Sequence, residues 1–413
     1  MIKEWKPDIW TKLYVFSLCL MAYTTANVSW FFSVPRQPLY LFVMATAIVK
    51  IMTNGVSINK KKFVWIFVWF IYFLVVILTR NTSLIGTLHR LLSFLIISTV
   101  ILLSIDEMKY LLKALTVCFV AILVISIPAW ILYLMGVPLP YTGPHYHANG
   151  FHIYYDYHFF TTTAKVTSSD YSRFSSVFLE PGQMATPCMF LFHLNTKEGK
   201  LFKFKNIVML VGVLMSFSLI AYGLLLVSLI ANQVQGRRRV WIALLTIITI
   251  VGLSTYFITH EDNVVYELIV SRLVYNEETG NISGYNRTTE DFEIRYAQMM
   301  KTSNKYFGIH NGENLDWITN TSGYKKYIVQ NGIVGLSILM LLMLILLWDN
   351  FNKESLVFIT MVIVAFFVRN LLTSSLWLTI TIIGMYILGQ TQNTDNILYS
   401  DEPDIGQQQA LPI

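Results

Sequence analysis

Apolar segments of membrane-spanning length recur along almost the whole chain of 413 residues, with mostly short polar connections between them. They lie at about 10–32, 38–53, 63–79, 84–104, 112–135, 173–194, 240–258, 328–348, 355–371 and 374–390. A helix needs about 20 apolar residues to cross the hydrocarbon core of a bilayer. Only 13% of the residues are charged, against about 25% in ordinary globular domains. We therefore expect an all-α polytopic membrane protein rather than a soluble domain.

The basic residues indicate orientation in the membrane rather than a nucleic-acid partner. The net charge is +6, but the lysines lie in short connections between apolar segments, as the positive-inside rule expects of cytoplasmic loops. Segment 206–233 is long for one helix and short for two. Because basic clusters flank it on both sides, two short or re-entrant helices with a hinge near 216–218 keep both clusters in the cytoplasm.

This arrangement predicts about 12 membrane helices in one integral membrane domain, residues 1–390, with both termini in the cytoplasm. Two longer polar segments, about 136–172 and 259–327, then lie on the outer side as loops. The polar tail at 391–413 is predicted to be disordered. The three cysteines lie far apart in apolar stretches and form no disulfide or metal-ligand pattern.

An arginine and a glutamate open the apolar segment that follows the first outer loop. Arg173 and Glu180 are seven residues apart, a spacing that returns to the same face of a helix after two turns. An ionised side chain facing lipid costs at least about 2.5–3.5 kcal/mol on insertion scales, so both should face a protein interior or a wet cavity. Pro181, Gly182 and Pro187 predict a broken helix, which is tolerated where it lines a cavity. The pattern predicts a polar site inside a membrane protein.

Further arginines collect at the same predicted outer ends. Arg90 and Arg369 lie near the outer ends of membrane segments, and Arg287 and Arg295 lie in the second outer loop. Planar guanidinium groups recognise phosphate in a bidentate way, so such a cluster suits a lipid-linked phosphate or diphosphate. The alternative is structural: Arg90 and Arg369 extend to the interface or pair with Glu180.

The first outer loop is rich in aromatic residues and histidines, with GPHYHANGFHIYYDYHFF at 143–160. Its histidines and Asp156 have no regular metal-ligand spacing, and we predict no metal site there. Tyr154 and its aromatic neighbours form a surface of the kind that stacks on sugar rings or lies at the membrane interface. Tyr154 is therefore a candidate substrate-binding residue, with packing as the alternative.

The second outer loop contains a predicted helix between Thr288 and Met300, with Thr288 or Thr289 as N-cap and acidic residues in the first turn. Gly308 and Gly312 bracket His310 in a turn. His310 is a candidate proton carrier, although a lone loop histidine is more often structural.

Two motifs together resemble the bacterial O-antigen and capsule polymerase superfamily, the Wzy-type enzymes and their O-antigen ligase relatives. The first is RFSSVFLEPG at 173–182, which enters a membrane segment after an outer loop. The second is Arg287, an amphipathic helix, YFGIH at 306–310 and QNGIVGL at 330–336. The resemblance covers about residues 165–350.

The resemblance implies an all-helical, GT-C-like membrane glycosyltransferase at the outer face of the bacterial inner membrane. Such enzymes transfer a growing chain between polyprenyl-diphosphate-linked oligosaccharides to make O-antigen, capsule or exopolysaccharide. The family's outer-loop arginines map to Arg173 and Arg287, and less closely to Arg295. Arginines neutralise the leaving diphosphate without a metal or other cofactor. Glu180 then orients or deprotonates the acceptor hydroxyl, or alternatively holds Arg173 or Arg90 in place.

Two departures from the family pattern affect the choice of function. The arginine-to-glycine spacing of some members is not reproduced, and Gly323 and Tyr324 stand where ligases place a histidine. The second departure favours a polymerase over a ligase, which is the first alternative. A lipid-linked oligosaccharide transporter is the other, but the chain has no internal repeat. The expected partners are the lipid-linked oligosaccharide, membrane lipid and a chain-length-regulating protein.

Overall fold

The computed structural model describes residues 5–25, 36–56, 58–79, 84–146, 153–164, 173–196, 202–233, 275–276, 281–282, 289–309, 316–318, 321, 323–372 and 374–400. These residues are mostly helical, as the apolar segments predict. The predicted span at 240–258 lies outside the described residues, as do Arg287 and His310.

The main bundle contains α1 (Ile9–Thr25), α2 (Arg36–Asn54), α3 (Lys60–Thr79), α4 (Leu84–Ile101), α5 (Ile105–Leu134), α6 (Pro181–Thr196), α7 (Phe204–Met215), α8 (Leu219–Gln233), α13 (Tyr324–Asp349), α14 (Lys353–Val368) and α15 (Ser375–Ser400). Among the described residues, four helical segments are long and apolar enough to cross a membrane: Lys60–Leu78, Leu84–Ile101, Ile105–Leu134 and Tyr324–Asp349. The apolar parts of α1, α7, α8 and α15 are shorter. Helix α15 continues to Ser400, through the first part of the predicted tail, and 401–413 lie outside the described residues.

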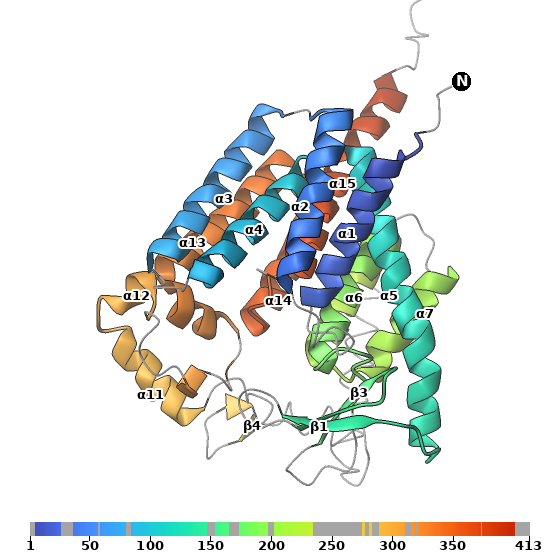
Figure 1. Ribbon diagram of the computed structural model, residues 1–413, viewed down its shortest axis with the longest axis vertical. Helices are drawn as coiled ribbons and strands as arrows, with labels where there is room; N and C mark the ends of the chain where they lie inside the picture. Colours follow the sequence, from blue (N-terminus) through green and yellow to red (C-terminus); the bar gives the residue numbers. More distant parts are fainter. Residues whose placement is uncertain are drawn as a thin grey trace, which may run out of the picture.

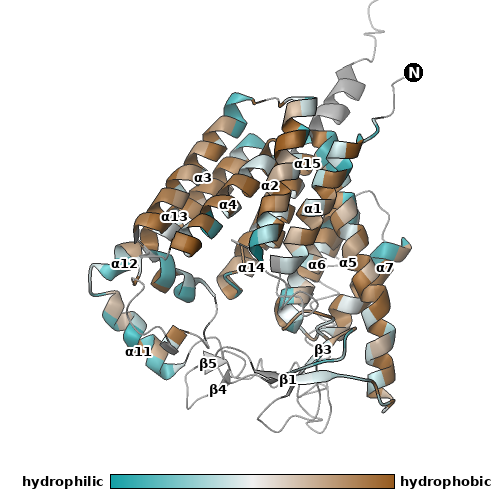
Figure 2. Cartoon of the chain, in the orientation of Figure 1, coloured by the Kyte–Doolittle hydropathy of each residue, from teal (hydrophilic) through white to brown (hydrophobic). Residues whose placement is uncertain are grey.

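Smaller elements gather at one end of the bundle, opposite the N-terminus (Figure 1). They are β1 (Thr142–Tyr146), β2 (Ile153–Asp156), β3 (Thr161–Ala164), β4 (Tyr275–Asn276), β5 (Asn281–Ile282), α11 (Glu290–Met299), α12 (Asn304–Phe307) and the 3-10 turn η3 (Asp316–Ile318). Figure 2 shows apolar residues along α3, α5 and α13, and hydrophilic residues on α12 and parts of α11. Helix α11 begins as predicted, because the Thr289 side chain accepts a hydrogen bond from the Phe292 amide.

Helix α15 lies at the centre of the bundle and packs against α1, α4, α5, α6, α13 and α14. A buried ion pair at the N-terminal end of the bundle joins α2 to α5: Lys50 Nζ and Glu107 Oε1 are 2.8 Å apart. Glu107 also completes the N-terminal cap of α5 with Ser104. At the same end, the Asp8 carboxylate accepts hydrogen bonds from the first turn of α1 and from Asn54.

The segment at 206–233 forms two helices, as the charge distribution predicts. Helix α7 ends at Met215 and α8 begins at Leu219. Between them Phe217 has a positive φ of 45°, which a continuous right-handed helix cannot contain.

The expectation of an all-α chain is wrong for part of segment 136–172, which was predicted to be the first outer loop. Strands β1, β2 and β3 form an antiparallel sheet in that order, with Tyr154 opposite Thr163 and Asp156 opposite Thr161. The physical reason is composition, because tyrosines and threonines favour a pleated, half-buried surface. Hydropathy alone reads the same residues as a polar connection.

Residues 173–180 do not form the start of a helix, so the reasoning from a shared helical face is also wrong. Helix α6 begins only at Pro181, which is favoured at the first helical position because it has no amide hydrogen to satisfy. Pro187 lies inside α6, which continues through it to Thr196. The predicted break therefore lies before the helix rather than within it.

Candidate functional site

Hydrogen bonds from two elements hold the irregular segment 174–179 in the interior. The amide and the hydroxyl of Thr161, in β3, donate to the carbonyls of Ser176 at 2.8 Å and Phe178 at 2.6 Å. The hydroxyl groups of Ser126, in α5, and Ser176 are 2.7 Å apart. Because buried backbone groups need such partners, these bonds fix the segment and deliver Glu180 to the first turn of α6.

Glu180 forms an ion pair with Arg369, which is 189 residues away in the sequence. Arg369 follows the last helical residue of α14, and its amide donates to the carbonyl of Ala365. The arginine is only 8% exposed, whereas the side chain of Glu180 is 42% exposed. A side chain at position 182 would occupy the space of the Arg369 guanidinium, so Gly182 is required for this contact.

Lys326 and Tyr154 complete the surroundings of Glu180. Lys326 lies in the first turn of α13, close enough to Glu180 for their charges to interact, and its ammonium donates to the carbonyl of Thr321 at 3.0 Å. Burial raises the pKa of the Tyr154 phenol above its usual range, and the Glu180 carboxylate raises it further. We refer to Glu180, Lys326 and Arg369 as the charged cluster.

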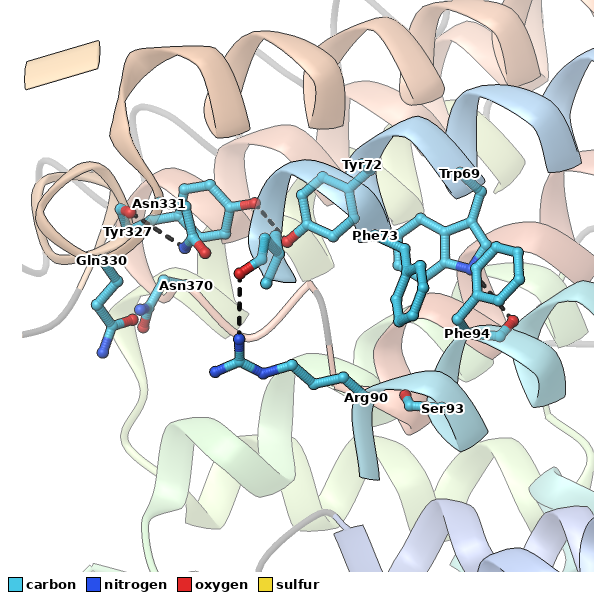
Figure 3. Close-up of a pocket in the computed structure, with 11 residues that line it drawn as sticks. Trp69, Tyr72, Phe73, Arg90, Ser93, Phe94, Tyr327, Gln330, Asn331 and Asn370 are labelled. Atoms are coloured by element: carbon cyan, nitrogen blue, oxygen red, sulfur yellow. Dashed lines mark hydrogen bonds between the residues drawn. The ribbon is translucent and has the colours of Figure 1, made fainter. Parts of the chain in front are cut away.

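A cavity of about 210 Å³ lies between α3, α4, α13 and the connection from α14 to α15 (Figure 3). One part of its wall is aromatic, and the other carries the polar side chains of Arg90, Gln330, Asn331 and Asn370. Its residues are Trp69, Tyr72, Phe73, Val76, Arg90, Ser93, Phe94, Tyr327, Gln330, Asn331 and Asn370. We refer to it as the amide cavity.

Hydrogen bonds set the shape of the amide cavity. The hydroxyls of Tyr72 and Tyr327 are 2.7 Å apart and join α3 to α13. Arg90 donates from Nη1 to the carbonyl of Val76 at 3.2 Å, as Figure 3 shows. Asn331 donates to the carbonyl of Tyr327 at 3.2 Å. The predicted residue Arg90 therefore faces a cavity with amide groups and aromatic rings.

The charged cluster and the amide cavity are adjacent, because two residues of the cluster are each followed in the sequence by a residue of the cavity wall. Arg369 belongs to the cluster and Asn370 to the cavity wall. Likewise, Lys326 belongs to the cluster and Tyr327 to the cavity wall. The two features therefore belong to one region at the sheet-bearing end of the bundle.

The second motif converges on the same region through a kink in α13. Gly332 has φ 68° and ψ 176°, a conformation accessible essentially only to glycine. The turn at 306–309 packs against this kink, with the Ile309 amide 2.8 Å from the carbonyl of Val329. The distant sequences YFGIH and QNGIVGL are therefore in contact beside Gln330, although the histidine of the first lies outside the described residues.

Arg173 bridges to the break between α7 and α8. Its Nε donates to the carbonyl of Ser216 at 3.2 Å, and its Nη2 to the carbonyl of Phe217 at 2.6 Å. Carbonyls at the end of a helix lack intrahelical partners, and a cation there is favoured by the helix dipole. These contacts give Arg173 a structural task at the helix break.

Arg295 and Tyr154, which the sequence suggested as substrate-binding residues, are neither in the charged cluster nor in the wall of the amide cavity. Arg295 is exposed on α11, where it pairs with Asp291 at 2.9 Å and lies 5.9 Å from the ring of Trp317. Tyr154 belongs to the central strand β2 and is only 5% exposed. Tyr141, by contrast, is 53% exposed and contacts the ring of Tyr155.

Lys326 is the charged residue of this region that sequence reasoning missed. It stands beside Lys325 at the start of an apolar segment, where a basic pair is read as an interfacial anchor. Only the fold separates them, because Lys325 pairs with Glu293 at 2.7 Å, whereas Lys326 donates to the carbonyl of Thr321 within range of the charge of Glu180. Within the described part of the chain, no group of three or more His, Cys, Asp or Glu side chains is arranged to hold a metal ion.

Comparison of the chain with protein-family models, with curated proteins and with solved structures gives no match. The function must therefore be argued from the site and from the sequence resemblance.

Proposed function

We propose that the protein is a membrane glycosyltransferase that polymerises polyprenyl-diphosphate-linked oligosaccharide repeat units into a surface polysaccharide. The observation that carries the proposal is the convergence of the two resembling motifs. The first delivers Glu180 to Arg369, and the second forms the kinked wall beside Gln330 and Asn331. A cation-containing cluster beside an amide- and aromatic-lined cavity suits a diphosphate attached to a sugar.

In the proposed reaction, an acceptor hydroxyl oxygen forms a bond to the anomeric carbon of the donor sugar. The bond from that carbon to the diphosphate oxygen breaks, and its electron pair leaves with the diphosphate. Glu180 accepts the hydroxyl proton, and Arg369 and Arg90 stabilise the departing negative charge together with Arg287. Arg173 acts as a positioning residue through the break between α7 and α8.

The proposal includes a location and a topology. The chain crosses the bacterial inner membrane about 12 times, with both termini in the cytoplasm and the sheet-bearing end of the bundle outside. Lys60, Lys61, Lys109 and Lys353 belong to the opposite end of the bundle from the sheet, as the positive-inside rule requires of this orientation.

The test is the size ladder of the surface glycan in the native host after deletion of the gene. Wild type should restore the ladder, and Glu180→Gln should leave single repeat units on the surface anchor at normal expression. Glu290→Gln is the matched control, because it makes the same change at an exposed glutamate in the first turn of α11. An unchanged ladder after deletion would refute the proposal, and long chains stranded on the lipid carrier would identify a ligase instead.

A further inference from the structure

The charged cluster contains two cations and one carboxylate. Arg369 and Lys326 face Glu180, while the neighbouring Lys325 is neutralised by Glu293. The first turn of α6 adds to the excess of positive charge, because the amino end of a helix carries a partial positive charge and the Arg369 guanidinium packs directly against Gly182 there. A buried charge needs compensation, so this arrangement favours one more negative group than the cluster holds.

The two members of the ion pair differ in solvent exposure. Arg369 is 8% exposed, and its Nε is buried without a hydrogen-bond partner. A guanidinium has five donor hydrogens in a fixed fork, so the contact with one carboxylate oxygen through Nη1 leaves donors for a second ligand. The side chain of Glu180 is 42% exposed, so its carboxylate can move into solvent while Arg369 stays in place.

We infer that Lys326 and Arg369 form a binding site for a diphosphate group, which Glu180 occupies as an internal stand-in until the ligand displaces it. The inference rests on the proposed function and extends it by naming Lys326 as a ligand of the donor. Lys326 reaches the site from α13 and Arg369 from the end of α14, so an anion between them joins these two helices. Phosphate oxygens replace the carboxylate because they accept several charge-assisted hydrogen bonds at once.

Displacement also explains how one carboxylate can serve two purposes. While Glu180 neutralises Arg369, one of its carboxylate oxygens accepts a hydrogen bond from the guanidinium. After the diphosphate takes that position, Glu180 is free to accept the proton of the acceptor hydroxyl. Donor binding therefore precedes activation of the acceptor.

The experiment measures anion binding by the purified full-length protein in detergent, from the ligand-dependent rise in its unfolding temperature. The probes are inorganic pyrophosphate, inorganic phosphate and farnesyl diphosphate. We expect both diphosphates to bind more tightly than phosphate. Tighter binding of farnesyl diphosphate than of pyrophosphate identifies a lipid-linked ligand, and equal binding identifies the free anion as sufficient. Stronger binding of phosphate than of either diphosphate would overturn the assignment of the ligand class.

Four variants test the displacement of Glu180 directly. Lys326→Gln should weaken pyrophosphate binding about tenfold or more, the effect of one charge-assisted hydrogen bond, and Lys326→Arg should restore part of it. Lys325→Gln removes the same charge one residue away and should leave binding unchanged. Glu180→Gln should tighten pyrophosphate binding, because the competing carboxylate is gone, even though polymer formation is lost.

Lys326→Gln and Glu180→Gln should change pyrophosphate binding in opposite directions, and this difference distinguishes the possible failures. Unchanged binding in Lys326→Gln, or weaker binding in a folded Glu180→Gln, would overturn the inference. If Glu180→Gln does not fold, the comparison of Lys326→Gln with Lys326→Arg and Lys325→Gln decides the question. If the binding results hold but gene deletion leaves the glycan ladder intact, the anion site stands and the proposed polymerase function fails.

Discussion

Replacement of Gly332 by alanine should disrupt the kink of α13 on which the turn at 306–309 rests. Gly332 has φ 68° and ψ 176°, and a Cβ there would overlap the carbonyl of Tyr306 and the amide of Phe307. Backbone strain of this kind costs about 1–3 kcal/mol. Loss of the hydrogen bond between Ile309 and Val329 adds about 0.5–1.5 kcal/mol. We expect Gly332→Ala to lower the free energy of unfolding by about 2–4 kcal/mol in total.

Two matched glycines separate the causes of this loss. Gly55 also has a φ of 68°, but a Cβ there meets no atom within 4 Å, so Gly55→Ala measures backbone strain without overlap, about 1–2 kcal/mol. Gly223 lies in α8 with no neighbour within 4 Å and no positive φ. Gly223→Ala should therefore stabilise the protein by up to about 1 kcal/mol.

The assay is unfolding of the purified variants in one detergent, together with the glycan ladder in the host. The expected order of stability is Gly223→Ala, wild type, Gly55→Ala and Gly332→Ala, and only the last should alter the ladder. If Gly332→Ala loses no more stability than Gly55→Ala, the close packing between the kink and the turn does not contribute as we argue.

Two further predictions concern the N-terminal end of the bundle. Lys50→Met should lower the free energy of unfolding by about 3–5 kcal/mol, because it leaves Glu107 buried without its partner. Adding Glu107→Gln should recover part of this loss. Equal losses in the single and double variants would contradict the prediction. Burial alone would raise the pKa of Asp8, but hydrogen bonds from Thr11, Asn54 and Trp10 outweigh it and hold the pKa below its ordinary value of 3.8. A carboxyl group with a lowered folded pKa stabilises the fold above its unfolded pKa and loses this contribution as the pH falls through the folded value. Because Asp8 is exposed and solvent screens its charge, Asp8→Ala should cost no more than about 1 kcal/mol at neutral pH. The unfolding temperatures of variant and wild type should begin to converge below about pH 4, as the pH falls toward the lowered folded pKa.

Sequence reasoning identified the features that depend on local charge and periodicity. The break between α7 and α8 follows from basic residues on both sides of 206–233. The acidic residues after 289 limited the N-cap of α11 to Thr288 or Thr289, and the structure has Thr289. Both signals are contained within one segment. The composition also predicted membrane-length apolar helices, four of which are present among the described residues.

Features that depend on distant partners were not predictable in the same way. Segment 174–179 is apolar enough to read as helix, but hydrogen bonds with Ser126, Thr161 and the carbonyl of Met215 hold it irregular. The sequence allowed a pair between Glu180 and Arg369 as one alternative among several, because no local pattern selects a partner 189 residues away. Lys326 was not predicted for the same reason, because its charge interacts with Glu180, which is distant in the sequence.

The two peptide bonds shared by the charged cluster and the amide cavity have a consequence for how this region can change during evolution. Residues 326–327 and 369–370 each divide between the two features, so a backbone shift that adapts the cavity also moves a cation of the cluster. Energetic effects of substitutions on the two sides should therefore be non-additive. Under the proposed function, a change in the sugar that the cavity accepts will need compensating substitutions around Glu180, and cavity residues transplanted alone into a related chain will transfer specificity incompletely.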